Sequence, residues 1–234
     1  MCGRYTLKMP DRVALAAERL FALRLRVDAR YNFAPSQVAA VIAREMAGEV
    51  AVREMQWGFR AHWAKEDARR VAPINARIEG IAARPMFREA VRKRRCVVPA
   101  DGFYEWRRGP EGAKTPMQIH LAGERAFFLA GIWAEGGEGE APTFAVLTTR
   151  PNALMATIHD RMPVVLEGER AREWVAAEPI AEASWAEWAE PFPAAEMVAY
   201  AVSSVVNSAR FDGPECVVAV VAGRDGPEQG LFGF

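Results

Sequence analysis

The 234-residue sequence predicts an α+β fold in a single domain, with a mainly antiparallel sheet and helices outside it. Short runs rich in β-forming residues outnumber the segments with helical periodicity. The two kinds of segment do not alternate along the chain, as they would in a doubly wound parallel sheet. No internal repeat and no long linker divides the sequence, so one domain is expected.

Three segments have the apolar spacing of an amphipathic helix. The first begins at Pro10 and continues through Phe21, and Asp11 is placed to cap the free amide groups at its start. The second begins at Arg84, and the third covers residues 169–177. The second helix carries a basic stripe formed by Arg88, Arg92, Lys93 and Arg95. A stripe of this kind is usually a solvated helix face.

The expected strands are short and are separated by glycine and proline. They comprise residues 51–57, 95–98, 127–133, 143–149, 162–166, 197–206 and 216–221.

Composition indicates an ordinary globular protein, with 51% hydrophobic and 26% charged residues. No apolar run is long enough to span a membrane, and the first residues lack the apolar stretch of a signal peptide. The chain has 3 widely spaced cysteines, which favours a reduced compartment over a disulfide framework. We therefore expect a cytoplasmic protein.

The net charge of zero hides a segregation of charge along the chain. Residues 1–114 contain 23 Lys and Arg against 13 Asp and Glu, a balance of +10. Residues 115–234 contain 7 against 17, a balance of −10. Such a chain can present a basic face to nucleic acid, or its two halves can neutralise each other across an interface. Charge alone leaves both interpretations open.

The cysteines and histidines do not have the spacing of a metal site, and no G-x-S-x-G motif of a serine hydrolase occurs. The unusual residue is Cys2, which follows the initiator Met1. Removal of Met1 would leave an α-amine and a thiol on adjacent carbons. A terminal α-amine is partly neutral at pH 7, so it can condense with an aldehyde, and the thiol can then close a five-membered ring. Taken alone, Cys2 is weak evidence for this chemistry.

A series of ordered motifs strengthens that evidence. They are residues 1–5 (MCGRY), 31–35 (YNFAP), 56–59 (QWGF), 74–79 (INARIE), 95–106 (RCVVPADGFYEW), 147–149 (LTT), 158–163 (IHDRMP) and 202–207 (VSSVVN). In this order they closely resemble the SOS-response-associated peptidase family, whose members are also described as abasic-site-processing proteins. The resemblance implies a barrel-like β core with peripheral helices over residues 1–223, followed by a C-terminal tail at 224–234.

The resemblance also implies four catalytic residues. Cys2 matches the nucleophile that bonds covalently to the ring-opened sugar of an abasic site in single-stranded DNA. Asn75 matches the residue that positions the cysteine amine, since an amide both donates and accepts hydrogen bonds. Glu105 matches the carboxylate that moves protons during imine formation. His159 matches the acid that protonates the sugar ring oxygen.

DNA contacts are expected from arginines that bind phosphate and from aromatic side chains on which bases stack. The expected residues are Arg4, Asn32, Trp57, Trp63, Arg77, Trp106, Thr149 and Arg161. Core packing is the alternative for each tryptophan, above all for Trp57. The segment after Gly58 lacks the proline common in the family, which puts the placement of Trp63 in doubt.

These implications describe a monomeric enzyme with crosslinking or lyase-type chemistry that needs no metal or organic cofactor. Its partner would be single-stranded DNA with abasic sites, or a junction of single and double strands, and binding would associate it with the nucleoid. Two alternatives stay open: an N-terminal cysteine peptidase whose α-amine serves as base, and a single-strand DNA-binding protein without chemistry.

Overall fold

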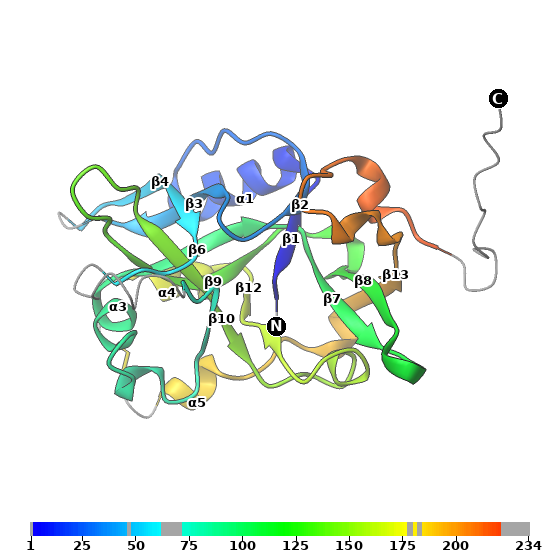
Figure 1. Ribbon diagram of the computed structural model, residues 1–234. Helices are drawn as coiled ribbons and strands as arrows, with labels where there is room; N and C mark the ends of the chain where they lie inside the picture. Colours follow the sequence, from blue (N-terminus) through cyan, green and yellow to red (C-terminus); the bar gives the residue numbers. More distant parts are fainter. Residues whose placement is uncertain (1, 46–47, 62–71, 177–179, 182–183, 221–234) are drawn as a thin grey trace.

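The computed structural model of the 234-residue chain describes residues 2–45, 48–61, 72–176, 180–181 and 184–220. The expected tail at 224–234 lies outside these residues. Strands dominate the described part, and the few helices lie at its periphery (Figure 1). The structure therefore confirms a single mixed domain with a mainly antiparallel β core.

Strands and helices have the following bounds. The strands are β1 (Arg4–Leu7), β2 (Arg30–Phe33), β3 (Val38–Arg44), β4 (Val50–Trp57), β5 (Asn75–Arg77), β6 (Arg95–Ala100), β7 (Gly102–Arg108), β8 (Lys114–Leu121), β9 (Phe127–Ala134), β10 (Thr143–Thr149), β11 (Met162–Pro163), β12 (Val165–Leu166) and β13 (Met197–Ala201). The α-helices are α1 (Pro10–Phe21), α3 (Arg88–Lys93), α4 (Glu169–Val175) and α5 (Trp185–Trp188). Short 3-10 turns include η1 (Ile81–Ala83), η4 (Met155–Thr157), η7 (Ser204–Asn207) and η8 (Pro214–Val217).

The strands form two sheets. One has the order β13-β8-β7-β1-β2 and is antiparallel throughout. In the other, β10, β4, β3, β6 and β9 follow one another as hydrogen-bonded neighbours, and β9 pairs back to β10, so these strands form a closed ring. The pairs of β10 with β4 and with β5 are parallel.

The ring has a different apolar partner on each of its two faces. Helices α1, α3 and α4 cover one face, where Trp174 packs against residues such as Val97 and Leu147. The five-stranded sheet covers the other face, where Phe103 packs with Val98 and Val146. Alternate residues of one strand, such as Val97 and Val98, therefore enter different parts of the core, as the period of two in a strand requires.

Several expectations from the sequence were wrong in detail. The second helix begins at Arg88 rather than Arg84, and Arg95 of the expected basic stripe lies buried on β6. Residues 216–220, the described part of the expected strand at 216–221, form η8 and one isolated bridge from Ala219 to Val202 instead of a strand. The strand expected at 197–206 ends at Ala201, and η7 follows it. Asp11 does not cap α1: Met9 is the cap residue, and its amide donates to the Asp101 carboxylate at 2.6 Å.

Candidate active site

Cys2 lies two residues before the start of β1, a strand that is hydrogen-bonded on both sides, to β7 and to β2. Arg4 pairs with Tyr104 in this register, so its extension toward the N-terminus brings Gly3 opposite Glu105. The Cys2 side chain is 0% exposed, and its thiol lies 3.7 Å from the Arg4 carbonyl oxygen. The N-terminal cysteine is therefore held in the core, close to the middle of β7.

The start of β7 depends on Gly102. A Cβ atom at this position would lie 2.6 Å from the Thr6 hydroxyl oxygen and 2.5 Å from the Gln118 side-chain nitrogen, closer than real contacts allow. Asp101 fastens the same corner by accepting a hydrogen bond from the Thr6 hydroxyl at 2.7 Å. These contacts fix the first strand against the strand that carries Glu105.

Asn75 begins β5, which runs parallel to β10 and pairs Asn75 with Val146. Its amide nitrogen donates to the Cys2 carbonyl oxygen at 2.8 Å. The oxygen of the same amide is buried and accepts no hydrogen bond in the described structure. A buried acceptor without a donor costs about 1–3 kcal/mol. The Asn75 side chain thus holds the cysteine backbone and keeps one acceptor open.

Glu105 lies on β7 and is 2% exposed. Burial is the main cause that raises the pKa of the Cys2 thiol, and the negative charge of Glu105 raises it further. Desolvation and a nearby carboxylate both disfavour a thiolate. Cys2 therefore rests as a thiol with a carboxylate within electrostatic reach.

His159 follows η4 on a loop that Asn152 stabilises by accepting a hydrogen bond from the Met155 amide at 2.8 Å. The backbone amide of Arg161 donates to His159 Nδ1 at 3.0 Å, and an Asp160 carboxylate oxygen lies 2.9 Å from the same atom. These two contacts suit different protonation states. When Nδ1 accepts from the amide, the neutral ring carries its proton on Nε2; when the ring is protonated, Nδ1 can pair with Asp160.

The structure brings Cys2, Asn75 and Glu105 together. Asn75 donates a hydrogen bond to the Cys2 carbonyl oxygen, and the charge of Glu105 acts on the Cys2 thiol. His159 is linked to them through its neighbour Ile158, which packs in the same apolar cluster as Cys2.

The expected DNA contacts divide by burial. Asn32 and Thr149 are 0% exposed and Trp57 is 1% exposed. Asn32 donates to three backbone carbonyl groups between 206 and 211, and Trp57 donates to the Ile74 carbonyl oxygen at 2.8 Å. These three side chains have no surface to offer DNA in this structure, and Trp57 packs in the core. Trp63 lies outside the described residues.

The remaining contact candidates lie nearer the surface. Arg4 donates to Asn32 at 3.0 Å and to the Val206 carbonyl oxygen at 2.6 Å, which fastens η7 to β1. Arg77 is exposed and makes no ion pair with any residue in the described ranges. Trp106 is half-buried and donates to the Asn207 side chain at 2.7 Å.

Arg161 forms a two-pronged ion pair with Glu79, with distances of 2.8 and 2.7 Å, and also donates to the Thr148 carbonyl oxygen. Burial acts to raise the pKa of Glu79, but the hydrogen bond and charge of Arg161 together with backbone hydrogen bonds outweigh it, and the net pKa is lowered. Glu79 was not singled out from the sequence, although it lies in one of the motifs, because a pairing across 82 residues leaves no local signal.

Comparison with known proteins places this geometry in a family. The family model described as SOS response associated peptidase (SRAP) matches residues 1–209. The chain belongs to the SRAP family. The abasic site processing protein YoqW of Bacillus subtilis is 35% identical over 222 residues, which cover 93% of this chain and 99% of that one. YedK of Escherichia coli, also named an abasic site processing protein, is 31% identical over 229 residues, covering 94% and 100%.

Solved structures agree with this SRAP assignment. A Bacteroides thetaiotaomicron protein of known structure superposes with a TM-score of 0.78 at 27% identity, covering 94% of this chain and all of that one. A phage-related protein of Bordetella bronchiseptica gives a TM-score of 0.69 at 30% identity, covering 87% and 95%.

In the part of the chain that the structure describes, no group of three His, Cys, Asp or Glu residues gathers where a metal ion could bind. Across the same residues, no helix is both long and apolar enough to cross a membrane.

Proposed function

We propose that this protein processes abasic sites in single-stranded DNA by forming a thiazolidine linkage through Cys2 after removal of Met1. The observation that carries the proposal is the hydrogen bond from Asn75 to the Cys2 carbonyl group, beside a buried amide oxygen that still lacks a donor. A free α-amine on Cys2 is a donor on the same residue. The names of relatives such as YoqW support the choice of abasic sites as substrate.

The first step opens the closed sugar. Protonated His159 can donate its Nε2 proton to the ring oxygen as the C1′–O bond breaks, and the C1′ hydroxyl group loses its proton to water, which leaves an aldehyde at C1′. The Asp160 carboxylate, 2.9 Å from Nδ1, can pair with the protonated ring. His159 is thus suited to act as an acid in its protonated form.

The second step joins protein and DNA. The Cys2 amine adds to C1′ of the aldehyde, and loss of one water molecule leaves an imine. Glu105 accepts a proton from the amine and returns one to the departing hydroxyl group. Because burial and Glu105 raise the pKa of the thiol, the amine reacts first. The thiol sulfur then adds to C1′, its proton ends on the nitrogen, and the five-membered ring closes without an oxidant or reductant.

Intact-mass measurement with an abasic single-stranded oligonucleotide tests the proposal. We expect the sum of oligonucleotide and Met1-free protein minus one water molecule, and no adduct with an intact oligonucleotide of the same sequence. Cys2→Ser should leave at most an imine that needs borohydride for trapping. Cys96→Ser is the matched control, since Cys96 is equally buried but internal.

Two variants test the acid and base roles. Glu105→Gln and His159→Ala should slow crosslinking by about 10²–10⁴-fold while single-strand affinity stays near that of the parent protein. A denaturation-resistant adduct of Cys2→Ser without reduction, or crosslinking by both other variants at the parent rate, would refute the mechanism. Binding without any adduct would point to a plain single-strand DNA-binding protein, and peptide cleavage without an adduct to an N-terminal cysteine peptidase.

A further inference from the structure

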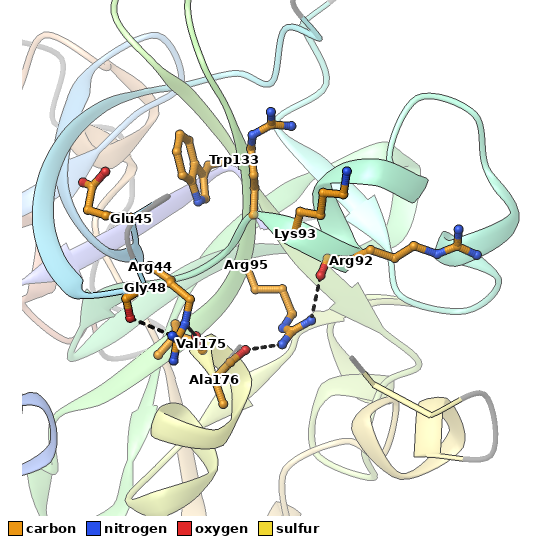
Figure 2. A pocket seen from close by; sticks show the side chains of 10 residues that line it. Arg44, Glu45, Gly48, Arg92, Lys93, Arg95, Trp133, Val175 and Ala176 are labelled. Atoms are coloured by element: carbon orange, nitrogen blue, oxygen red, sulfur yellow. Dashed lines mark hydrogen bonds between the residues drawn. The ribbon is translucent and has the colours of Figure 1, made fainter. Parts of the chain in front are cut away.

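A cavity of about 310 Å³ is lined by residues that the candidate active site does not use (Figure 2). Its walls come from the end of β3 and the turn after it, the end of α3, the start of β6, the end of β9, and the end of α4 with the segment that follows it. None of Cys2, Asn75, Glu105 and His159 lines it. The cavity is therefore separate from the candidate active site.

Cations dominate the lining of this cavity. The charged residues that line it are Arg44, Arg92, Lys93, Arg94, Arg95 and Glu45. Three of these cations belong to the basic stripe that the sequence marked after Arg84. The acid Glu45 lies 3.5 Å from Arg53, which also pairs with Glu135 at 3.0 Å. The charge of Glu45 is therefore paired with an arginine that does not line the cavity.

Two arginines of the lining donate hydrogen bonds to backbone carbonyl groups. Arg44 donates to the carbonyl oxygens of Val175 at 3.1 Å and Gly48 at 2.6 Å, and it makes no ion pair with a described carboxylate. Arg95 is 5% exposed and donates to the carbonyl oxygens of Trp174 and Ala176. Burial, and next the charge of Arg44, lower the pKa of Arg95 to about 10. The charges of Arg44 and Arg95 thus lie close enough to act on each other.

Trp133 supplies a donor of a different kind. The indole is 1% exposed and lines the cavity, and its ring nitrogen is buried without an acceptor among the described residues. Arg53 packs over the ring, 4.5 Å from its centroid, which fixes the indole in place. Indole nitrogen only donates hydrogen bonds, and a buried donor is normally paired. An acceptor-rich ligand in the cavity would pair it.

We propose that this cavity binds a phosphate group, with Arg44 and Lys93 supplying charge and Trp133 a neutral donor. A phosphate group is a multiply charged acceptor with several oxygens, which matches a lining of many donors and little free negative charge. The group can belong to inorganic phosphate or to the backbone of a nucleic acid strand. The inference does not depend on the chemistry of Cys2.

Titration with inorganic phosphate, followed by phosphorus NMR at constant ionic strength maintained with chloride, tests the site. We expect saturable binding that weakens about tenfold in Arg44→Gln and several-fold in Trp133→Phe, since each change removes a donor to a charged group. Trp133→Phe keeps the aromatic ring and every charge. Arg24→Gln is the matched control, because Arg24 is exposed and lies outside the cavity. Thermal melting without phosphate checks that each variant is folded.

A second titration with an undamaged single-stranded oligonucleotide identifies the source of the phosphate group. Weaker strand binding by Arg44→Gln and Trp133→Phe assigns the cavity to a backbone phosphate, and unchanged strand binding with weaker inorganic phosphate binding assigns it to a free phosphate. Two results overturn the proposal: no saturable phosphate binding by the parent protein, or an equal loss in Arg24→Gln. Because the strand is undamaged, neither result bears on the adduct at Cys2.

Discussion

Replacement of Asn75 by alanine isolates the positioning of Cys2 from the chemistry. The substitution removes the 2.8 Å hydrogen bond to the Cys2 carbonyl oxygen and the buried acceptor that would receive the α-amine. A neutral hydrogen bond contributes about 0.5–1.5 kcal/mol, so the two together amount to roughly 2 kcal/mol. Each 1.4 kcal/mol is about tenfold in rate, and crosslinking should slow by roughly 10–100-fold. For a chain of this length, the loss of about 1 kcal/mol of folding free energy lowers Tm by about 2–4 °C.

Single-turnover crosslinking to an abasic oligonucleotide, resolved on a denaturing gel, measures the rate, and thermal melting of the same preparation measures stability. Gln56→Ala is the matched control, because the Gln56 amide also donates to one backbone carbonyl group, that of Ser36 at 2.9 Å, and is no part of the candidate site. We expect Gln56→Ala to crosslink at the parent rate. If both variants slowed crosslinking to the same extent, or if Asn75→Ala reacted at the parent rate, the positioning role would be refuted.

Four further outcomes are expected. Protein that retains Met1 should give no thiazolidine, as a mass spectrum of the mixed product would show, because an amide nitrogen on Cys2 cannot form the ring. Arg77→Gln should weaken binding to all single strands alike and reduce the salt dependence of log Kd by about one charge, which a titration over several salt concentrations measures. Glu105→Gln should speed alkylation of Cys2 in folded protein while slowing crosslinking, since removal of the carboxylate lowers the thiol pKa; a fall in both rates would indicate structural damage instead. The ion pair of Glu79 stabilises the fold above the usual glutamate pKa of about 4.3, and this stabilisation is lost as pH falls through the lower pKa that Glu79 has in the folded protein. Glu79→Gln should therefore reduce the loss of stability at acid pH, which thermal melts recorded from neutral to acid pH measure.

The fold class could be predicted from the sequence because it follows from local patterns of strand-forming and helix-forming residues. The strand runs at 51–57, 127–133 and 143–149 correspond to β4, β9 and β10, which all lie in the ring. Strands β1, β2, β3, β5, β7 and β8 were not predicted. The alternation in β1 is too short to stand out, and in β8 a proline follows the second residue, a position usually unfavourable for a strand. Tertiary pairing with neighbouring strands decides their conformation.

The candidate catalytic residues could be named from motifs, but their contacts could not. Asn75 and Cys2 are 73 residues apart, and only the parallel pairing of β5 with β10 brings them together. Two of the buried contact candidates share a feature. Asn32 and Trp57 carry polar groups that suit a DNA contact, yet both satisfy those groups on backbone carbonyls inside the protein. A motif indicates that a side chain has a fixed role, but only its burial in the structure shows whether the side chain is exposed to a ligand or packs in the core.

The position of Cys2 suits a chain terminus to the proposed role of nucleophile. Terminal residues are poorly ordered unless a neighbouring structure ties them down. Here β1 pairs on both sides, Asp101 fastens its far end through Thr6, and Asn75 holds the Cys2 carbonyl group. Folding therefore bears the entropic cost of fixing the amine and thiol before DNA arrives. Prior fixing of reacting groups is among the larger sources of rate acceleration, so loosening of β1 should slow crosslinking even when every catalytic side chain is intact.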